Sequence, residues 1–281
     1  MDTLPEHVRS AFHAESGEAL SLSTAWDNGW RVGKMALMPV VQTETASISA
    51  KLRDHLKPQH VRLARPVRAT DGRYVVSGWR ASLWEPGELQ AGRVDETAVA
   101  ALRLADALAT EKIPPAVQAP ITGPWQDSQV FLVADRAAWA ADPAAILSLG
   151  LGGQASEKVE FALRLAARIV PLIPPIEAPN QLGHADMLAT TIWAGSQDPV
   201  VTDLVPVAHP HGYTAAQVIV DGLLADAVDR GIIMRFGSVP DIIGLLLRAL
   251  LYRTFVHGLS DGVDVRNEAR LEQVLDWIIR G

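Results

Sequence analysis

The sequence predicts an α+β protein with two lobes, a small strand-rich lobe followed by a larger helical lobe. Short apolar segments separated by turn dipeptides fill the chain up to about residue 84. A Glu85-Pro86-Gly87 segment then breaks the pattern, and beyond it the apolar residues recur with helical spacing. We therefore expect a small lobe at 1–84, a linker at 85–87 and a helical lobe at 88–281.

The small lobe is predicted to contain strands, one helix and a hairpin. Its expected strands are residues 19–24, 29–32, 34–41, 61–69 and 74–84. Asn28-Gly29 and Asp71-Gly72 mark turns between strands, because Asn, Asp and Gly tolerate positive φ. Residues 43–56 form the expected helix, with Thr43 as its N-cap.

The second lobe is predicted to be almost entirely helical. Its expected helices are residues 95–108, 156–172, 214–230, 240–256 and 266–280. Ser156 is suited to cap the second of these, whose apolar residues form a single stripe. Residues 114–127 form a proline-containing connection. The run Gly150-Leu151-Gly152-Gly153 lacks the spacing of a phosphate-binding loop and is interpreted as a linker.

Composition narrows the classes of function. The chain has 281 residues, no cysteine and a net charge of −7, which excludes disulfides and disfavours a general nucleic-acid surface. The first ten residues lack the apolar core of a secretory signal, and the apolar run 242–251 is too short to span a bilayer. We expect a cytoplasmic protein that binds neither nucleic acid nor membrane.

The segment 181–207 carries the strongest chemical signal. His184 and Asp186 precede an apolar strand, and a second strand after a Gly-Ser-Gln-Asp turn ends on Asp203. Kinase-like phosphotransferases hold a catalytic base and a metal ligand on such a pair of strands. With a strand-rich lobe before it, this hairpin completes a protein-kinase-like arrangement.

Other interpretations of these residues stay open. His-x-Asp also occurs as a structural hydrogen bond, and an acid at the end of a strand can simply cap a turn. His209 and His211 suggest a metal, but the sequence offers no evident third ligand. A G-x-S-x-G motif is absent, so a serine hydrolase has little support.

The chain resembles the aminoglycoside phosphotransferase branch of the protein-kinase-like superfamily. More narrowly, it is similar to an actinobacterial family of functionally uncharacterised proteins related to those enzymes. The resemblance covers nearly the whole chain through residues 28–33, 61–68, 78–84, 134–142 and 183–207, continuing to Asp221. It implies a two-lobed protein-kinase-like fold, with ATP and Mg²⁺ as cofactors.

The resemblance assigns roles in the catalytic loop. Asp186 matches the base that orients the substrate hydroxyl, and His184 matches the histidine that supports the loop. Asp203 matches the acid that joins the metal to the phosphates. Thr190 stands where relatives carry an asparagine that ligates the metal, so a second metal ion is in doubt.

The small lobe departs further from the pattern. Met38 stands where relatives carry the lysine that pairs with nucleotide phosphates. Arg31, on the neighbouring strand, is the predicted replacement cation, and Glu44 is the predicted helix glutamate. Trp84, with Trp26, is expected near the nucleotide cleft. Residues 23–28, which would cover the phosphates, contain no glycine.

Two functions follow from these departures. The first is a degenerate kinase-like protein, a pseudokinase that binds a small molecule or nucleotide, or regulates, with impaired phosphotransfer. The alternative is an active Mg-ATP-dependent phosphotransferase acting on a small hydroxylated molecule. In that case Asp186 is the base, Asp203 and Thr190 hold Mg²⁺, and Arg31 replaces the lysine.

Overall fold

The computed structural model describes residues 4–14, 16–121, 123–150, 156–260 and 268–280. Contacts divide the chain into two compact units, one of residues 1–118 with 180–214 and one of residues 119–179 with 215–281. The first holds most strands and the second is helical, which confirms the α+β class. The predicted lobe boundary at 85–87 stays a prediction.

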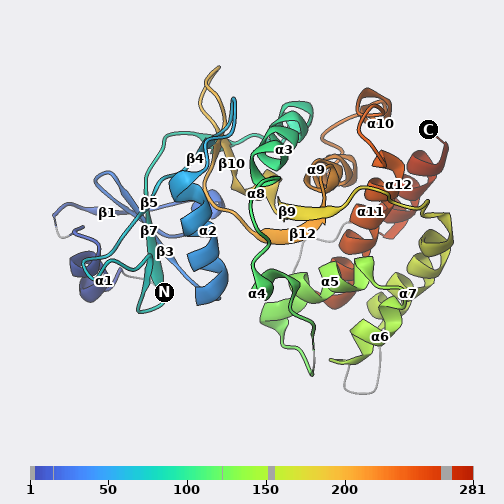
Figure 1. The fold of residues 1–281 in the computed structure, drawn as a ribbon, viewed down its shortest axis with the longest axis horizontal. Coiled ribbons are helices and arrows are strands. Elements are labelled where there is room, and N and C mark those ends of the chain that lie inside the picture. The colour runs from blue at the N-terminus through green and yellow to red at the C-terminus, as the bar shows by residue number, and fades with distance from the viewer. Residues whose placement is uncertain (1–3, 15, 122, 151–155, 261–267, 281) are drawn as a thin grey trace. The chain divides into compact units, whose positions relative to one another are not determined.

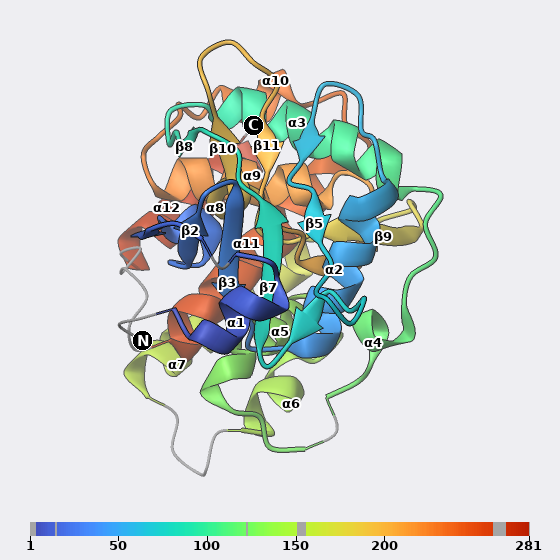
Figure 2. The ribbon, with the colours of Figure 1, turned by 90° about the vertical axis from the view of Figure 1, so that its left-hand side faces the viewer.

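The first unit is built on a six-stranded antiparallel sheet (Figure 2). The strand order is β1-β2-β3-β7-β5, and β6 pairs with β7 beside β5. The strands are β1 (Ala19–Ser21), β2 (Trp30–Val32), β3 (Met35–Pro39), β5 (Pro66–Val67), β6 (Val75–Val76) and β7 (Trp79–Leu83). The long β3 and β7 pair along five residues and form the centre of the sheet.

Two predicted strands are divided in the structure. The segment 61–69 yields β4 (Arg62–Leu63) and β5, which belong to different sheets. The segment 74–84 folds back on itself as β6 and β7, because Ser77 and Gly78 both adopt positive φ and form a tight turn. Asp71-Gly72 does form a turn, but it lies in an excursion between β5 and β6, which follow one another along the same edge of β7.

The β1–β2 connection contains a turn of 3-10 helix, η1 (Thr24–Trp26), in place of the end of the predicted first strand. Asp27 and Asn28 follow with φ of 51° each. Gly29 is required for a different reason: a Cβ at this position would lie 2.2 Å from the Leu37 carbonyl oxygen of β3. This close approach fixes the loop against the sheet.

The two faces of the sheet bury different clusters. On one face Val8 and Phe12, from helix α1 (Glu6–Ala11) and its end, pack on Leu37, Trp79 and Ala81. Residues of β3 that point to the other face, Ala36 and Met38, enter a second cluster. This is the alternation expected of a strand buried on both sides.

The other strands of the first unit form two smaller sheets. One has the order β4-β11-β10-β8, and the other pairs β9 with β12. Their bounds are β8 (Glu88–Leu89), β9 (Asn180–His184), β10 (Thr191–Trp193), β11 (Val200–Val201) and β12 (Pro206–Pro210). The predicted pair of strands around the Gly-Ser-Gln-Asp turn is therefore present as the antiparallel β10 and β11.

Helices complete the first unit. These are α2 (Thr43–His55), α3 (Val94–Leu108), α4 (Pro115–Gln118) and α8 (Met187–Thr190). Helix α2 contacts β5, β6 and β12, so it lies between the large sheet and the smallest one (Figure 1). It begins at the first residue of the predicted range, but Gln42 is in the cap position that was predicted for Thr43.

The second unit packs helices around the buried α11 (Figure 1). Its helices are α5 (Val130–Trp139), α6 (Pro143–Ser148), α7 (Glu157–Ile169), α9 (Tyr213–Leu224), α10 (Ile232–Arg235), α11 (Ile242–Leu259) and α12 (Glu268–Arg280), with 3-10 turns η2 (Asp127–Gln129) and η3 (Val170–Leu172). Helix α9 starts within the first unit. Ser156 caps α7 as predicted, accepting a hydrogen bond from the Val159 amide at 3.3 Å. The predicted linker segment 151–153 lies outside the described residues.

Helix α11 is longer than the apolar run predicted from the sequence. It extends to Leu259, giving 18 residues with a mean hydropathy of 1.4. By length and composition it could cross a membrane, but 78% of the window is buried inside the structure. That burial is typical of a core helix.

Candidate functional site

The predicted catalytic loop lies at the end of β9 and is held by His184. The ring Nδ1 of His184 accepts a hydrogen bond from the Val205 amide at 2.9 Å. In the neutral ring Nε2 must therefore carry the proton, which it donates to the Thr190 hydroxyl at 2.8 Å. Thr190 in turn donates to the Asp186 carbonyl oxygen at 2.6 Å. His184 thus fixes the loop that carries Asp186.

This arrangement depends on a neutral histidine. Burial lowers the pKa of His184 to about 4, outweighing the attraction of Asp203. Asp186 occupies the N-cap position of α8, and its side chain is half-buried. The structure therefore brings the side chains of His184 and Thr190 to the backbone of Asp186, while the roles assigned to the three residues stay predictions.

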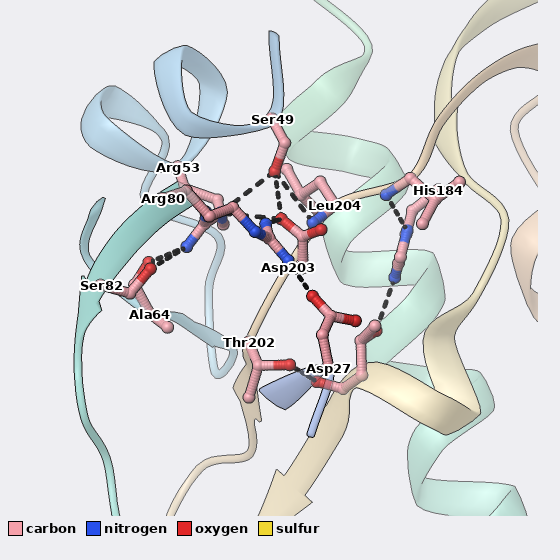
Figure 3. A network of polar contacts seen from close by, with 12 residues as sticks. Asp27, Ser49, Arg53, Ala64, Arg80, Ser82, His184, Thr202, Asp203 and Leu204 are labelled. Atoms are coloured by element: carbon pink, nitrogen blue, oxygen red, sulfur yellow. Dashed lines mark hydrogen bonds and ion pairs between the residues drawn. The ribbon is translucent and has the colours of Figure 1, made fainter. Parts of the chain in front are cut away.

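Asp203 follows β11 two residues after its end, and three side chains converge on one of its oxygens, Oδ1 (Figure 3). The Ser49 hydroxyl donates to it at 2.5 Å. A terminal nitrogen of Arg53 lies 3.4 Å away, and a terminal nitrogen of Arg80 forms a closer ion pair. The carboxylate is therefore bound from both the helix and the large sheet.

Arg80 reaches Asp203 from the centre of the large sheet. It lies on β7 directly opposite Met38 of β3, so both side chains project from the same face. One terminal nitrogen pairs with Asp203 and the other with Asp27 at 2.5 Å. A cation therefore lies on the strand next to Met38, the position that the resemblance matches to a lysine.

Arg53 reaches Asp203 from helix α2. Its guanidinium also donates to the Ala64 carbonyl at 2.6 Å and to the Ser82 hydroxyl at 3.0 Å. Burial lowers the pKa of Arg53 to about 10, and Asp203 opposes that change. Arg53 therefore remains charged at neutral pH.

The charges of this cluster determine its protonation. Burial acts to raise the pKa of Asp203, but the attraction of Arg80 and Arg53 outweighs it, so the pKa falls below its usual range. Burial acts to lower the pKa of Arg80, but Asp203 and Asp27 raise it. Asp203, Arg53 and Arg80 are therefore ionised at neutral pH.

The loop expected to cover the phosphates is bound to the same hairpin. The Thr202 hydroxyl donates to the Ala25 carbonyl at 2.6 Å, and Asp27 pairs with Arg80. Trp26 and Met38 are 3% and 1% exposed and share one buried cluster with Ile192 of β10. Apolar side chains therefore fill the space between β3, this loop and the hairpin.

The other predicted site residues, Arg31, Trp84 and Glu44, lie outside the ion cluster around Asp203. The Arg31 guanidinium stacks over the Trp84 ring, 3.5 Å from its centre, and donates to the Gly33 carbonyl at 3.0 Å. Trp84 packs against the cluster of Trp26 and Met38. Glu44 lies in the exposed first turn of α2. The roles assigned to these residues stay predictions.

The sequence interpretation missed Ser49, Arg53, Arg80 and Asp27. The segment Trp79–Leu83 alternates apolar and polar residues, a pattern typical of a half-exposed strand. In the structure its polar face is directed at Asp203 instead of solvent. Ser49 and Arg53 are four residues apart on one buried face of α2, a signal that the sequence contained.

The charge at this position does not fit Mg²⁺. Asp203 supplies a single negative charge, and two guanidinium groups already share it. A divalent cation beside them would be repelled, and the Thr190 hydroxyl is engaged with His184 and Asp186. Among the residues that the structure describes, no group of three or more His, Cys, Asp or Glu could hold a metal ion.

The histidines near Pro210 have structural partners. His209 lies in β12, buried, with its ring edge-on to Tyr213 at 4.6 Å between ring centres. His211 contacts Asp106 at 2.7 Å. Pro210, between them, is the last residue of β12 and pairs with Asn180 of β9.

Comparison with known proteins supports the fold. No protein-family model matches the sequence, and no curated protein matches it significantly. Among solved structures the chain is similar to an aminoglycoside phosphotransferase from Alicyclobacillus acidocaldarius, with 16% identity, 100% of this chain and 93% of the other covered, and a TM-score of 0.53.

Two further structures show the same relation. Aminoglycoside phosphotransferase APH(4)-Ia is 14% identical over 97% of each chain, with a TM-score of 0.54. A choline/ethanolamine kinase family protein from Mesorhizobium loti is 12% identical over 94% of this chain and 88% of its own, with a TM-score of 0.52. A variant of APH(4)-Ia was solved with AMP-PNP and hygromycin B. The chain thus has the protein-kinase-like fold of these enzymes.

Proposed function

We propose that this chain is a kinase-fold protein that binds a small molecule or nucleotide, or regulates through such binding, with impaired phosphotransfer. The solved structures that it resembles include phosphotransferases, one of them in complex with AMP-PNP and hygromycin B. Nucleotide binding is therefore a reasonable starting point for the ligand. The proposal is that the site binds this ligand but transfers its phosphate poorly or not at all.

The arrangement around Asp203 carries this proposal. In kinases this acid holds Mg²⁺, while a strand lysine pairs with a helix glutamate. Here the strand position is the apolar Met38, and helix α2 directs Arg53 at the acid instead of a carboxylate. With Arg80 on its other side, Asp203 is positioned as the centre of a buried ion cluster, which disfavours metal ligation.

The alternative, an active phosphotransferase for a small hydroxylated molecule, draws on the loop at Asp186. The hydrogen bonds from His184 through Thr190 hold this loop in a defined conformation. Such positioning is what a catalytic base requires. This loop supports the alternative, whereas the cluster around Asp203 favours the first proposal.

A phosphotransfer assay distinguishes the two. The purified chain, with labelled ATP and Mg²⁺, is offered a panel of small hydroxylated molecules, and transfer of label is compared with Asp186→Asn. We expect no transfer above that of the variant. Transfer that falls by about 10²- to 10⁴-fold on Asp186→Asn, the usual effect of losing a general base, would overturn the proposal in favour of the active enzyme.

A further inference from the structure

The charged side chains of the ion cluster around Asp203 differ widely in their exposure to solvent. Arg53 and Arg80 bring two positive charges, and Asp203 brings one negative charge. The side chains of Arg53 and Arg80 are 1% and 6% exposed and that of Asp203 is 20% exposed. Asp27 supplies the second negative charge with a side chain that is 51% exposed. The buried part of the cluster therefore has one positive charge in excess, balanced by a group at the surface.

Asp27 is the member of the cluster that can leave at low cost. Its carboxylate is already half in water, so it loses little by becoming fully solvated. The loop backbone has its own hydrogen bonds, from the Asp27 amide to the Thr24 carbonyl and from the Asn28 amide to the Ser23 carbonyl, so the carboxylate can move while the loop stays in place. If Asp27 departs, the outward nitrogen of Arg80 requires another anion, because an unpaired buried charge is strongly unfavourable.

We propose that Arg80, supported by Arg53, binds the phosphate group of a nucleotide or phosphate ester without a divalent metal, and that Asp27 occupies this position when the ligand is absent. The planar guanidinium donates hydrogen bonds in a geometry that suits phosphate oxygens. Its two terminal nitrogens can bind different anions at the same time, as they do here with Asp203 and Asp27. Asp203 retains the inner nitrogen and keeps the guanidinium oriented. The one positive charge that the two arginines carry in excess of Asp203 attracts the phosphate in place of Mg²⁺.

This inference rests on the proposed function, since it names the ligand class of the same site. It also specifies how the ligand reaches Arg80, namely by displacing the Asp27 carboxylate. Ligand and Asp27 compete for one nitrogen of Arg80, so weakening Asp27 strengthens ligand binding. A purely structural ion pair would show no such competition.

The experiment measures binding by isothermal titration in EDTA, using ATP, ADP and inorganic pyrophosphate as probes at constant ionic strength. Wild type is compared with Asp27→Asn, which removes the competing charge while keeping a residue that tolerates positive φ. Asp71→Asn is the matched control, because Asp71 is an exposed acid that also pairs with an arginine, Arg73, in the same unit. Thermal melts check that every variant is folded.

We expect Asp27→Asn to bind at least one probe about tenfold more tightly than wild type in EDTA, and Asp71→Asn to match wild type. Binding of ATP and ADP but not pyrophosphate identifies a nucleotide, and equal binding of all three identifies the phosphate alone. Arg80→Lys keeps the charge but loses the paired nitrogens, and should weaken binding by about tenfold or more.

The inference is overturned if no probe binds to wild type or Asp27→Asn without metal, or if Asp27→Asn leaves the affinity unchanged. Binding that strictly requires Mg²⁺ overturns it as well. These results are separate from the phosphotransfer assay, which alone decides the proposed function. A chain that transfers no phosphate and binds no phosphate probe would retain the proposed function and lose this inference.

Discussion

His184 shows how a single buried side chain determines local geometry through its protonation state. With Nδ1 accepting from Val205 and Nε2 donating to Thr190, the ring satisfies both of its polar atoms only when neutral. A second proton on Nδ1 would face the Val205 amide hydrogen. Burial lowers the pKa of His184 to about 4, and the hydrogen bonds of the ring are those of a single neutral tautomer.

This predicts a pH dependence of stability. The unfolded chain binds a proton at His184 near pH 6.5, whereas the folded chain does so near pH 4. Between these values the unfolded state binds more protons, so the free energy of unfolding decreases as the pH falls, by up to about 3 kcal/mol. Urea unfolding between pH 7 and pH 4 measures this decrease.

His184→Gln is the informative comparison for that measurement, because glutamine cannot take up the proton. The variant should be less stable at pH 7 but should lose less stability than wild type on acidification. Equal losses in the two proteins would show that His184 titrates normally and that the acid sensitivity arises at carboxylates.

At the scale of an element, helix α2 is anchored by its polar face. Ser49 and Arg53 lie one turn apart, and both contact Asp203. Arg53 also binds the carbonyl of Ala64 and the hydroxyl of Ser82, so it joins the helix to two neighbouring segments. The position of this helix thus depends on buried polar contacts as well as on apolar packing.

We predict that Arg53→Met lowers the free energy of unfolding by about 3–5 kcal/mol, because Asp203, the Ala64 carbonyl and the Ser82 hydroxyl each lose a buried partner. Lys51→Met, on the exposed side of the same helix, should change it by less than about 0.5 kcal/mol. Urea unfolding measures both variants. A loss of less than about 1 kcal/mol for Arg53→Met would mean that Arg80 and Ser49 satisfy Asp203 without Arg53, which would contradict the anchoring role of Arg53.

Helices and strands could be predicted from the sequence where a local residue pattern determines them. Helices α2, α3 and α7 lie close to their predicted bounds, since capping residues and apolar periodicity act within a few residues. The split of 61–69 between two sheets could not be predicted, because the pairing of β4 with β11 joins residues far apart in the chain. Ser77-Gly78 was missed as a turn because serine rarely adopts positive φ.

In the candidate site, the loop that carries Asp186 could be predicted from the sequence, but the charged residues that surround Asp203 could not. His184, Asp186 and Thr190 follow one another within seven positions of the sequence, so a motif could identify them. Arg80 and Asp27 lie far from Asp203 in the sequence, although the structure brings them together, and their polar character alone indicated solvent exposure. Only the pairing of β3 with β7 reveals that Arg80 stands beside Met38.

At the scale of the whole molecule, the two compact units have different kinds of interior. The first encloses a buried ion cluster between sheets, and the core of the second is formed by the apolar helix α11 against α5 and α7. Leu250 of α11 is fully buried. The second unit therefore depends on close apolar packing for its stability.

We predict that Leu250→Ala lowers the free energy of unfolding of the second unit by about 2–5 kcal/mol, through lost burial and the cavity left behind. Met234→Ala, at a side chain that is 73% exposed, should have almost no effect. Hydrogen exchange followed by mass spectrometry reads the protection of α5, α7 and α11 separately from that of the first unit. Unchanged protection of these helices in Leu250→Ala would show that the core rearranges to fill the cavity.

The register that sets Arg80 beside Met38 also governs how readily this site could be converted into one with a strand lysine. Introducing lysine at position 38 first would place a third cation among Arg53 and Arg80, in a cluster where Met38 is 1% exposed. Removing Arg80 first would leave Asp203 and Asp27 without their shared partner. Either order passes through a less stable protein, because neighbouring charges do not act additively. Directed evolution by single substitutions would therefore be expected to stall here, whereas exchanging both positions together could succeed.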